Sequence, residues 1–354
     1  MKVSVESRRL AAALQNSLAD KTSPLPIFEH VLLEADGDHL TVTSCDGARE
    51  LVATIEAEVH TPGSTTAHSR KLKAAATMDG GITLARESNA VPDLKVSQGR
   101  RRFSVMALSP RDYPTGPKFD DDKPPTRVPV SAMELAEAIS RVQYAAGKGD
   151  VRQYLNGVCV RSADVVATDG HRMSVFTMSA ASKKDILIPR DSLKLLLTAL
   201  REDDAVVMMD DSCLEVQHAA GRFRTQMIDG RYPDYKQLLR VQEGVPEVRV
   251  LPGTLLQSLG RVSAFVGQHR MARIEYQDGS LAIYADKTDD TFDLVPAELT
   301  GGEWPDFGIN VDYLSELAHA IGKPFRWVCP GPVTGQFFFS DDQRVVDVIQ
   351  PARL

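Results

Sequence analysis

Apolar residues recur along this chain in two patterns, one typical of helices and one typical of strands. Residues 193, 196, 197 and 200 are leucines, and this spacing places them on one face of a helix. The stretches 38-DHLTVTSCDG-47, 164-DVVATDG-170 and 278-DGSLAIYADKT-288 instead alternate apolar and polar residues and end near turn-forming residues, which predicts strands. A helix stripe of this kind is buried on one face of a sheet, so we expect an α+β protein.

The helical pattern occurs six times. It spans 3–18, 65–78, 128–142, 186–200, 248–262 and 307–321, with polar residues at the expected N-cap positions Ser7, Ser69, Ser131, Asp191 and Asp312. The landmark leucines of these segments are Leu10, Leu72, Leu135, Leu193, Leu255 and Leu314. They are separated by 62, 63, 58, 62 and 59 residues. Spacing this even over the whole length indicates an internal repeat.

A second internal similarity indicates that the six repeats are arranged in pairs. The stretch 109-SPRDYPTGP-117 resembles 228-IDGRYPDYK-236, and Tyr113 and Tyr232 are 119 residues apart, or two repeats. We therefore predict three similar domains, 1–120, 121–245 and 246–354, with linkers in 115–126 and 239–247. Repetitive bodies of this kind usually bind an extended partner.

Composition narrows the classes of protein. The chain has 354 residues, 43% apolar and 25% charged, which is typical of globular proteins. No apolar run could span a membrane and no signal segment precedes the first charges, so we expect a cytoplasmic protein. The four cysteines lie far apart, which argues against a zinc ribbon or a disulfide framework. A net charge of −7 argues against a protein that coats nucleic acid with its whole surface, but cations could still gather on one face.

Candidate chemistry is sparse. The chain has no phosphate-binding loop, no G-x-S-x-G elbow and no H-E-x-x-H motif, so neither a cofactor nor a metal is predicted. The stretch 166-VATDGHRMSV-175 places Asp169 two residues before His171, which could serve as a general-base pair or hold a metal. Alternatively, Asp169 and Gly170 form a turn whose backbone is bonded by Thr168 and Asp169, or the turn shapes a binding surface.

Five segments resemble one known family. They are 154-YLNGV-158, 167-ATDGHRMSV-175, 229-DGRYPDY-235, 308-GINVDYL-314 and 348-VIQPARL-354, and together they are similar to the bacterial sliding clamp, the β subunit of DNA polymerase III. The resemblance covers the full length. It implies the DNA-clamp fold: three domains, each of two β-α-β-β-β units, with sheets outside and helices lining a central hole. Two chains would form a head-to-tail ring around duplex DNA, as a non-catalytic processivity factor associated with the nucleoid.

A sliding ring needs contacts to phosphates without base readout. The resemblance implies a DNA-contacting loop before 154-YLNGV-158, with a second loop near 20–24. Basic residues on the predicted helices and at their ends add further candidates. The candidates are Lys21, Thr22, Arg70, Lys71, Lys148, Arg152, Gln153 and Tyr154. Gln153 replaces a second aromatic residue of the family beside Tyr154, which weakens a base-stacking role. Arg8, Arg9, Arg141 and Arg261 also lie on predicted helices and could face the bore; alternatively, these cations belong to ordinary solvated helix faces.

The resemblance also implies a groove for short linear peptides from the polymerase α subunit, the clamp loader, other polymerases and repair proteins. Its residues would be Leu155, Thr168, Gly170, His171, Arg172, Met173, Pro233, Gln237, Leu238, Arg270, Asn310, Tyr313, Val333, Val348, Ile349, Gln350, Pro351, Ala352, Arg353 and Leu354. Apolar anchors with a few polar groups suit such a ligand.

Four groove positions depart from the family pattern. Gln237 stands where a basic residue is common, Arg270 where an aromatic gate is expected, Gln350 in place of a methionine, and Ala352 in place of a larger apolar residue. Methionine adapts to many ligands better than glutamine or alanine does. One hypothesis is therefore a specialised, secondary clamp with altered peptide or inhibitor selectivity.

Ring closure would pair the edge strand 102–108 with the region 262–267. Phe103, Val105, Ala264 and Phe265 are the predicted apolar contacts. Two other classes stay open: a hydrolase or transferase that uses Asp169 and His171, and a monomeric peptide-binding repeat protein that never closes on DNA. Opening the ring would need a separate ATP-driven loader, because the chain has no nucleotide-binding motif.

Overall fold

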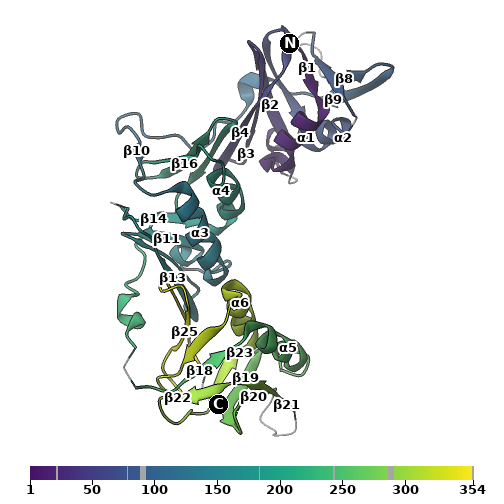
Figure 1. Ribbon diagram of the computed structural model, residues 1–354. Coiled ribbons are helices and arrows are strands. Elements are labelled where there is room, and N and C mark those ends of the chain that lie inside the picture. The colour runs from purple at the N-terminus through teal and green to yellow at the C-terminus, as the bar shows by residue number, and fades with distance from the viewer. Residues whose placement is uncertain are drawn as a thin grey trace. The chain divides into compact units, whose positions relative to one another are not determined.

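The chain packs into two compact units, with one large apolar cluster in the first and two in the second. The computed structural model describes residues 1–20, 23–77, 79–87, 93–182, 184–241, 244–285 and 291–352 (Figure 1). One unit comprises Met1–Val128 and Lys194–Met227, and the other comprises Pro129–Leu193 and Ile228–Leu354. The three predicted domains do not coincide with these two units, and the division into three domains stays a prediction.

The six predicted helical segments each contain an α-helix. The helices are α1 (Ser7–Gln15), α2 (Ser69–Ala75), α3 (Ala132–Val142), α4 (Leu193–Leu200), α5 (Pro252–Val262) and α6 (Val311–Ile321). Each of them contains one landmark leucine, and none of these six leucines is more than 2% exposed. The repeat seen in the sequence is therefore a repeat of helix-to-core contacts, which are strong determinants of helix position.

The predicted N-caps are correct at one helix and displaced at others. Ser131 caps α3, where its Oγ accepts the backbone N–H of Glu134. Ser7 is instead the first residue of α1, and its hydroxyl donates to the Gly80 carbonyl at 2.6 Å. Asn310 caps α6 in place of Asp312. Serine and aspartate are equally suited to the cap and to the first turn, so composition alone does not separate the two positions.

The first unit contains two antiparallel sheets. The smaller has the order β5 (Glu58–Thr61), β1 (Lys2–Glu6), β7 (Gly81–Ala85), β8 (Asp93–Gln98) and β9 (Arg101–Met106). The larger has the order β10 (Thr126–Arg127), β15 (Val206–Met209), β16 (Cys213–His218), β17 (Gly221–Gln226), β4 (Arg49–Glu56), β3 (His39–Cys45), β2 (His30–Asp36) and β6 (Gly63–His68). Strand β3 confirms the strand predicted within 38–47. Helices α1 and α2 pack against each other, and their buried leucines join the apolar core of this unit.

The second unit contains a sheet of nine strands and a sheet of four. The larger has the order β14 (Ile186–Pro189), β11 (Gly157–Arg161), β12 (Asp164–Thr168), β13 (Arg172–Thr177), β26 (Val345–Ile349), β25 (Gln336–Ser340), β24 (Phe325–Val328), β18 (Glu247–Val250) and β22 (Glu298–Thr300). The smaller has the order β21 (Phe292–Pro296), β20 (Ser280–Tyr284), β19 (Met271–Gln277) and β23 (Phe307–Asn310). Strands β12 and β20 confirm two predicted strands; residues 286–288 of the latter stretch lie outside the described residues.

The pairing of β13 with β26 joins distant parts of the sequence. The ladder runs antiparallel from Arg172 opposite Ile349 to Phe176 opposite Val345. Beside it, the guanidinium of Arg141 on α3 binds the carboxylate of Asp347, which also accepts the hydroxyl of Tyr144 at 2.8 Å. The last strand of the chain is therefore fixed to the strand that follows the Asp169–His171 turn.

Two further expectations from the composition concern the cysteines and membrane-spanning segments. All four cysteines are buried free thiols. Burial raises the pKa of Cys213 to about 12, so this thiol stays protonated near neutral pH. Over the described ranges, no helix is both long and apolar enough to cross a bilayer.

Candidate functional site

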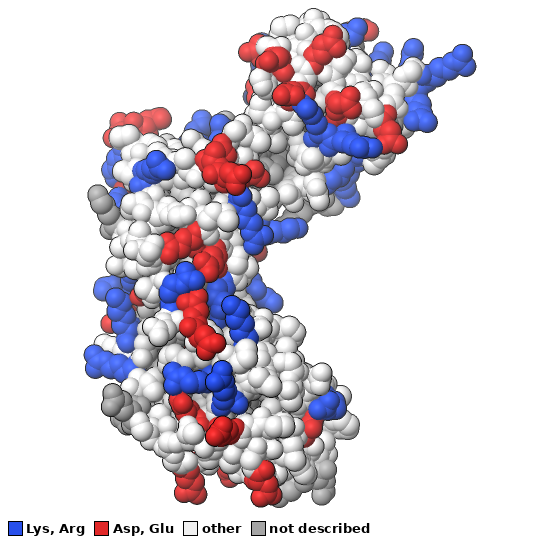
Figure 2. All heavy atoms as spheres, viewed as in Figure 1, with Lys and Arg blue, Asp and Glu red and all other residues white. Residues whose placement is uncertain are grey.

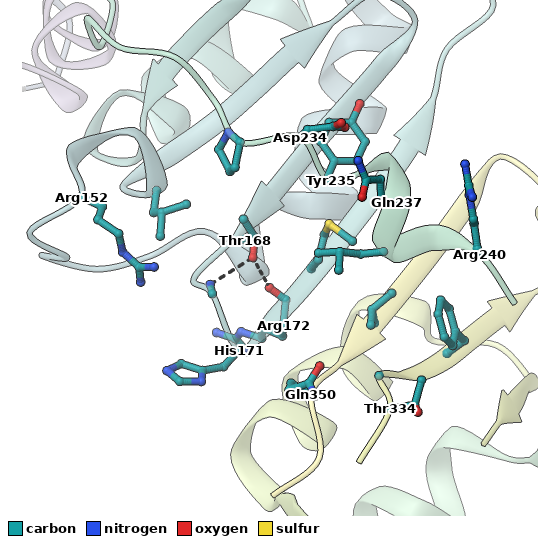
Figure 3. Close-up of a pocket in the computed structure, with 18 of the residues that line it drawn as sticks. Arg152, Thr168, His171, Arg172, Asp234, Tyr235, Gln237, Arg240, Thr334 and Gln350 are labelled. Atoms are coloured by element: carbon teal, nitrogen blue, oxygen red, sulfur yellow. Dashed lines mark hydrogen bonds between the residues drawn. The ribbon is translucent and has the colours of Figure 1, made fainter. Parts of the chain in front are cut away.

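A groove of about 420 Å³ lies in the second unit, where three segments distant in sequence meet (Figure 3). Eleven predicted groove residues line it: Leu155, Thr168, Gly170, His171, Arg172, Met173, Pro233, Gln237, Leu238, Val348 and Gln350. Eight further lining residues are Arg152, Tyr154, Asp234, Tyr235, Arg240, Thr334, Gly335 and Phe337. The sequence proposed Arg152 and Tyr154 for DNA contact and did not single out the other six for any site.

One wall of the groove is the turn between β12 and β13. The Thr168 hydroxyl accepts the N–H of Gly170 at 3.0 Å and donates to the carbonyl of Arg172 at 2.6 Å (Figure 3). Asp169 Oδ1 accepts the N–H groups of His171 and Arg172 at 2.9 and 3.0 Å. Gly170 has a φ of +90°, a backbone conformation that glycine adopts without a Cβ penalty. These bonds match the turn interpretation of the sequence.

Asp169 and His171 do not form a catalytic pair. The Asp169 carboxylate is occupied by two backbone N–H groups and by Nε of Arg172 at 3.0 Å. The His171 ring is stacked on Tyr313, with ring centroids 6.4 Å apart. A base and its orienting acid must be within hydrogen-bond reach of each other, and here the carboxylate serves the backbone turn instead. His171 therefore presents an aromatic surface to the groove.

Arg172 holds this wall in place. Its Nε binds Asp169 and its Nη1 donates to Glu316 Oε2 on α6 at 2.6 Å. The guanidinium carbon lies 4.4 Å from the ring centroid of Tyr313 and 5.4 Å from that of Tyr144. A planar guanidinium can stack on aromatic rings while it donates in plane, so Arg172 connects the turn to α6 and to Tyr144, which follows the end of α3.

The end of the described chain forms the floor. Gln350 donates its N–H to the His171 carbonyl at 2.7 Å, and its side-chain amide donates to the Val333 carbonyl at 3.2 Å. Ala352 exchanges two backbone bonds with Gly308, at 2.8 and 3.1 Å. A chain end usually frays unless such bonds hold it. This one is docked between the turn and β23.

The third segment, 233–240, is anchored by two buried tyrosines. Tyr232 and Tyr235 belong to the same apolar cluster as Met173, Phe337 and Val348. The Tyr235 hydroxyl donates to Asp164 at 2.8 Å, and burial raises the pKa of this phenol well above its ordinary value. The anchoring leaves Gln237, Leu238 and Arg240 exposed along the groove.

At the other end of the groove, a cation is paired with a neighbouring carboxylate. Arg152 donates through Nε and Nη2 to Asp150, at 3.0 and 2.8 Å. These bonds lower the pKa of Asp150 to about 2, so the pair stays ionised at neutral pH.

Seven predicted groove residues lie outside the lining: Arg270, Asn310, Tyr313, Val333, Ile349, Pro351 and Ala352. Most of them support the wall or floor through the contacts above. Arg270 has a φ of +56° and donates two bonds to Asp312, at 2.9 and 2.8 Å, so its side chain is committed to α6. Arg353 and Leu354, also predicted for the groove, lie outside the described residues.

The predicted DNA-contacting residues fall in two regions. Arg70 and Lys71 are exposed on α2, and Lys148, Arg152 and Gln153 are exposed in the loop before β11, with Tyr154 half-buried. Lys21 and Thr22 lie outside the described residues. Arg141 is not available for DNA, because its ion pair with Asp347 leaves its side chain only 13% exposed.

The predicted dimer contacts differ in exposure. Phe103 on β9 is 47% exposed and Phe265 is 66% exposed, and Ala264 is exposed beside Phe265. Val105 is 1% exposed and lies in the core of its own unit, so it cannot supply contact area to a partner. Exposed arginines stand just before Phe103, at the β8–β9 hairpin, and this hairpin projects as a basic tip in Figure 2.

Comparisons with known proteins identify the family of this chain. Residues 1–117 match the model of the DNA polymerase III beta subunit N-terminal domain, and residues 129–234 match that of its central domain. The beta sliding clamps of Vibrio cholerae and Escherichia coli are 28% and 26% identical to this chain over the full length of both proteins. A crystal structure of the Pseudomonas aeruginosa beta subunit matches all of both chains with a TM-score of 0.88 and 26% identity. The chain therefore belongs to the DNA polymerase III beta subunit family, the bacterial sliding clamps.

Proposed function

We propose that two copies of this chain close into a ring around duplex DNA and tether the replicative polymerase there by binding its short peptide segment in the groove. The chain is a DNA sliding clamp and a non-catalytic processivity factor. The observation that carries the peptide part of the proposal is the groove: a docked chain end, a rigid turn and an anchored loop enclose an apolar floor. Few, well-placed polar groups around apolar pockets suit a short ligand.

The proposed partners are duplex DNA, the polymerase α subunit, the clamp loader, and other polymerases and repair proteins that carry such peptides, at the nucleoid in the cytoplasm. A Pseudomonas aeruginosa clamp has been crystallised bound to griselimycin, so a relative with a TM-score of 0.89 accepts a ligand. For DNA, the proposed contacts are the exposed cations of α2 and of the loop before β11. Such contacts bind phosphates without sequence preference.

Ring closure is tested by retention on DNA. After loading by a clamp loader, the wild-type chain is expected to stay on a nicked plasmid and to leave when the plasmid is cut. Phe265→Asp places a charge in the proposed apolar contact and is expected to abolish retention. Gel filtration of loaded plasmids measures both results. Leu251→Asp, at another exposed apolar residue, is the control and is expected to be retained. Equal release from nicked and linear DNA contradicts the ring.

Peptide binding is tested at the turn. His171→Ala removes an aromatic surface that lines the groove and stacks on Tyr313. We expect affinity for a fluorescent clamp-binding pentapeptide to fall about three- to tenfold, as for a moderate contact residue. Fluorescence polarisation measures the change. His319→Ala, on the exposed face of α6, should leave the affinity unchanged. Unchanged binding by the His171 variant would remove this turn from the site.

The specialised-clamp hypothesis concerns the same groove. Gln237 and Gln350 line it and add two amide groups to a largely apolar lining, whereas Arg270 is bound to Asp312 and Ala352 to Gly308. Ordinary micromolar affinity for the generic pentapeptide would end this alternative. The monomeric alternative is separated by light scattering, since a single chain has a mass of 38.8 kDa.

A further inference from the structure

Arg240 is the one groove cation without an acidic partner among the residues that the structure describes. Three arginines line the groove. Arg172 is bound by Asp169 and Glu316, and Arg152 is bound by Asp150. Across the described ranges, Arg240 makes neither an ion pair nor a side-chain hydrogen bond, and it is exposed. Among those residues, no carboxylate competes with a ligand for the charge of Arg240.

The residues next to Arg240 in the chain determine the direction of its side chain. Leu239 and Val241 pack against the apolar cluster that contains Tyr232, Phe337 and Val348. Arg240 has extended backbone angles, φ −83° and ψ 115°. In an extended chain, adjacent side chains point to opposite sides, so the packing of both half-buried neighbours against the cluster directs Arg240 outward. A fixed backbone reduces the entropy lost when the guanidinium binds.

Arg240 also lies apart from the other cations. In Figure 3 it is across the groove from Arg152 and His171, with the apolar floor between them. Asp234, the one carboxylate among the described lining residues, lies nearer Gln237 in this view and accepts the N–H of Lys236 at 3.2 Å. Asp234 would oppose a second carboxylate near the middle of the groove. A ligand carboxylate is therefore favoured at the Arg240 end.

We propose that Arg240 is a specificity determinant that selects peptides with an acidic residue at one end of their apolar anchors. This inference rests on the proposed peptide-binding function and names the class of partner segment. A guanidinium offers a planar pair of donors to a carboxylate, so an aspartate or glutamate at this position gains a charge-assisted bond that an amide cannot match.

The test uses the full chain and four fluorescein-labelled peptides with blocked ends, all built on the generic clamp-binding pentapeptide as their core. Two carry Asp before or after the core, and two carry Asn at the same places. At one of the two places, Asp is expected to bind the wild-type chain about threefold more tightly than Asn, a ratio typical of exposed ion pairs. Arg240→Gln should reduce this ratio to about one. The ratio should also shrink as salt increases.

Lys236→Gln is the matched control, because Lys236 is an exposed cation of the same segment outside the groove lining. It should keep the wild-type preference. Equal binding of Asp and Asn peptides by the wild-type chain overturns the role of Arg240 while peptide binding stands, as does a preference that survives in Arg240→Gln. If none of the four peptides binds, the groove function fails, and this inference fails with it.

Discussion

Replacing Asp347 with alanine is expected to lower the free energy of unfolding by about 3–5 kcal/mol, the usual cost of removing one partner of a buried ion pair. Asp347 is 1% exposed and accepts from Arg141 and from the Tyr144 hydroxyl. Without it, the Arg141 guanidinium remains buried beside β26 without its counter-ion. Urea denaturation of the wild-type and variant chains measures the difference.

An exposed ion pair in the same region supplies the control. Glu137 on α3 binds Arg344, which precedes β26, at 2.9 Å, and both side chains are about half exposed. Glu137→Ala should cost less than about 1 kcal/mol, because solvent screens the pair and already solvates its charges. A loss at Asp347 no larger than that at Glu137 would show that the buried pair does not hold β26 in place.

The second large effect is a loss of stability in acid caused by His30. This side chain is fully buried, and burial lowers its pKa from 6.5 to about 4, with a further lowering by His68 and Lys71 and an opposing effect of Glu29. Within the described part of the chain its Nε2 has no hydrogen-bond partner, whereas Nδ1 lies 3.1 Å from the Thr66 hydroxyl. The folded protein thus strongly prefers the neutral ring.

The direction in which His30 changes the stability of the protein with pH follows from proton linkage. Above pH 6.5 the ring is neutral in both states and His30 imposes no cost. Between pH 6.5 and 4 the unfolded chain binds a proton that the folded chain does not. The free energy of unfolding therefore decreases as the pH is lowered, by up to about 3 kcal/mol. Hydrogen exchange of β2 and β6 amides at pH 7 and pH 4.5 measures this loss.

His30→Gln should remove most of the pH-dependent part, although it costs some stability at pH 7. His319→Gln, at an exposed position on α6, should retain the wild-type pH dependence. If the His30 variant loses as much stability between pH 7 and 4.5 as the wild type does, carboxylate titration and not His30 accounts for the acid sensitivity.

The helices could be predicted from the sequence because their determinants are local. The six leucines recur at nearly equal spacing, and each is buried in its helix. The turn at Asp169 could also be interpreted from its own residues. Sequence similarity to the clamp family added the groove residues, which no local pattern connects.

What the sequence did not reveal depends on contacts between distant segments. Arg141 looks like a helix-face cation, yet its partner Asp347 is 206 residues away. Phe103 and Val105 share one side of β9 by alternation, but Phe103 lies nearer the hairpin end and remains exposed. Arg240, Thr334 and Phe337 become groove residues only because 233–240 and 334–350 fold beside the turn.

The antiparallel ladder between β13 and β26 has a consequence for how partners arrive. It joins the turn wall of the groove to its floor through five consecutive residue pairs, so these two sides cannot separate without breaking backbone hydrogen bonds. If the groove binds peptides as we propose, an incoming peptide meets two sides whose arrangement is set beforehand and need not wait for them to open. Competing partners should then exchange at rates governed by how quickly each one departs.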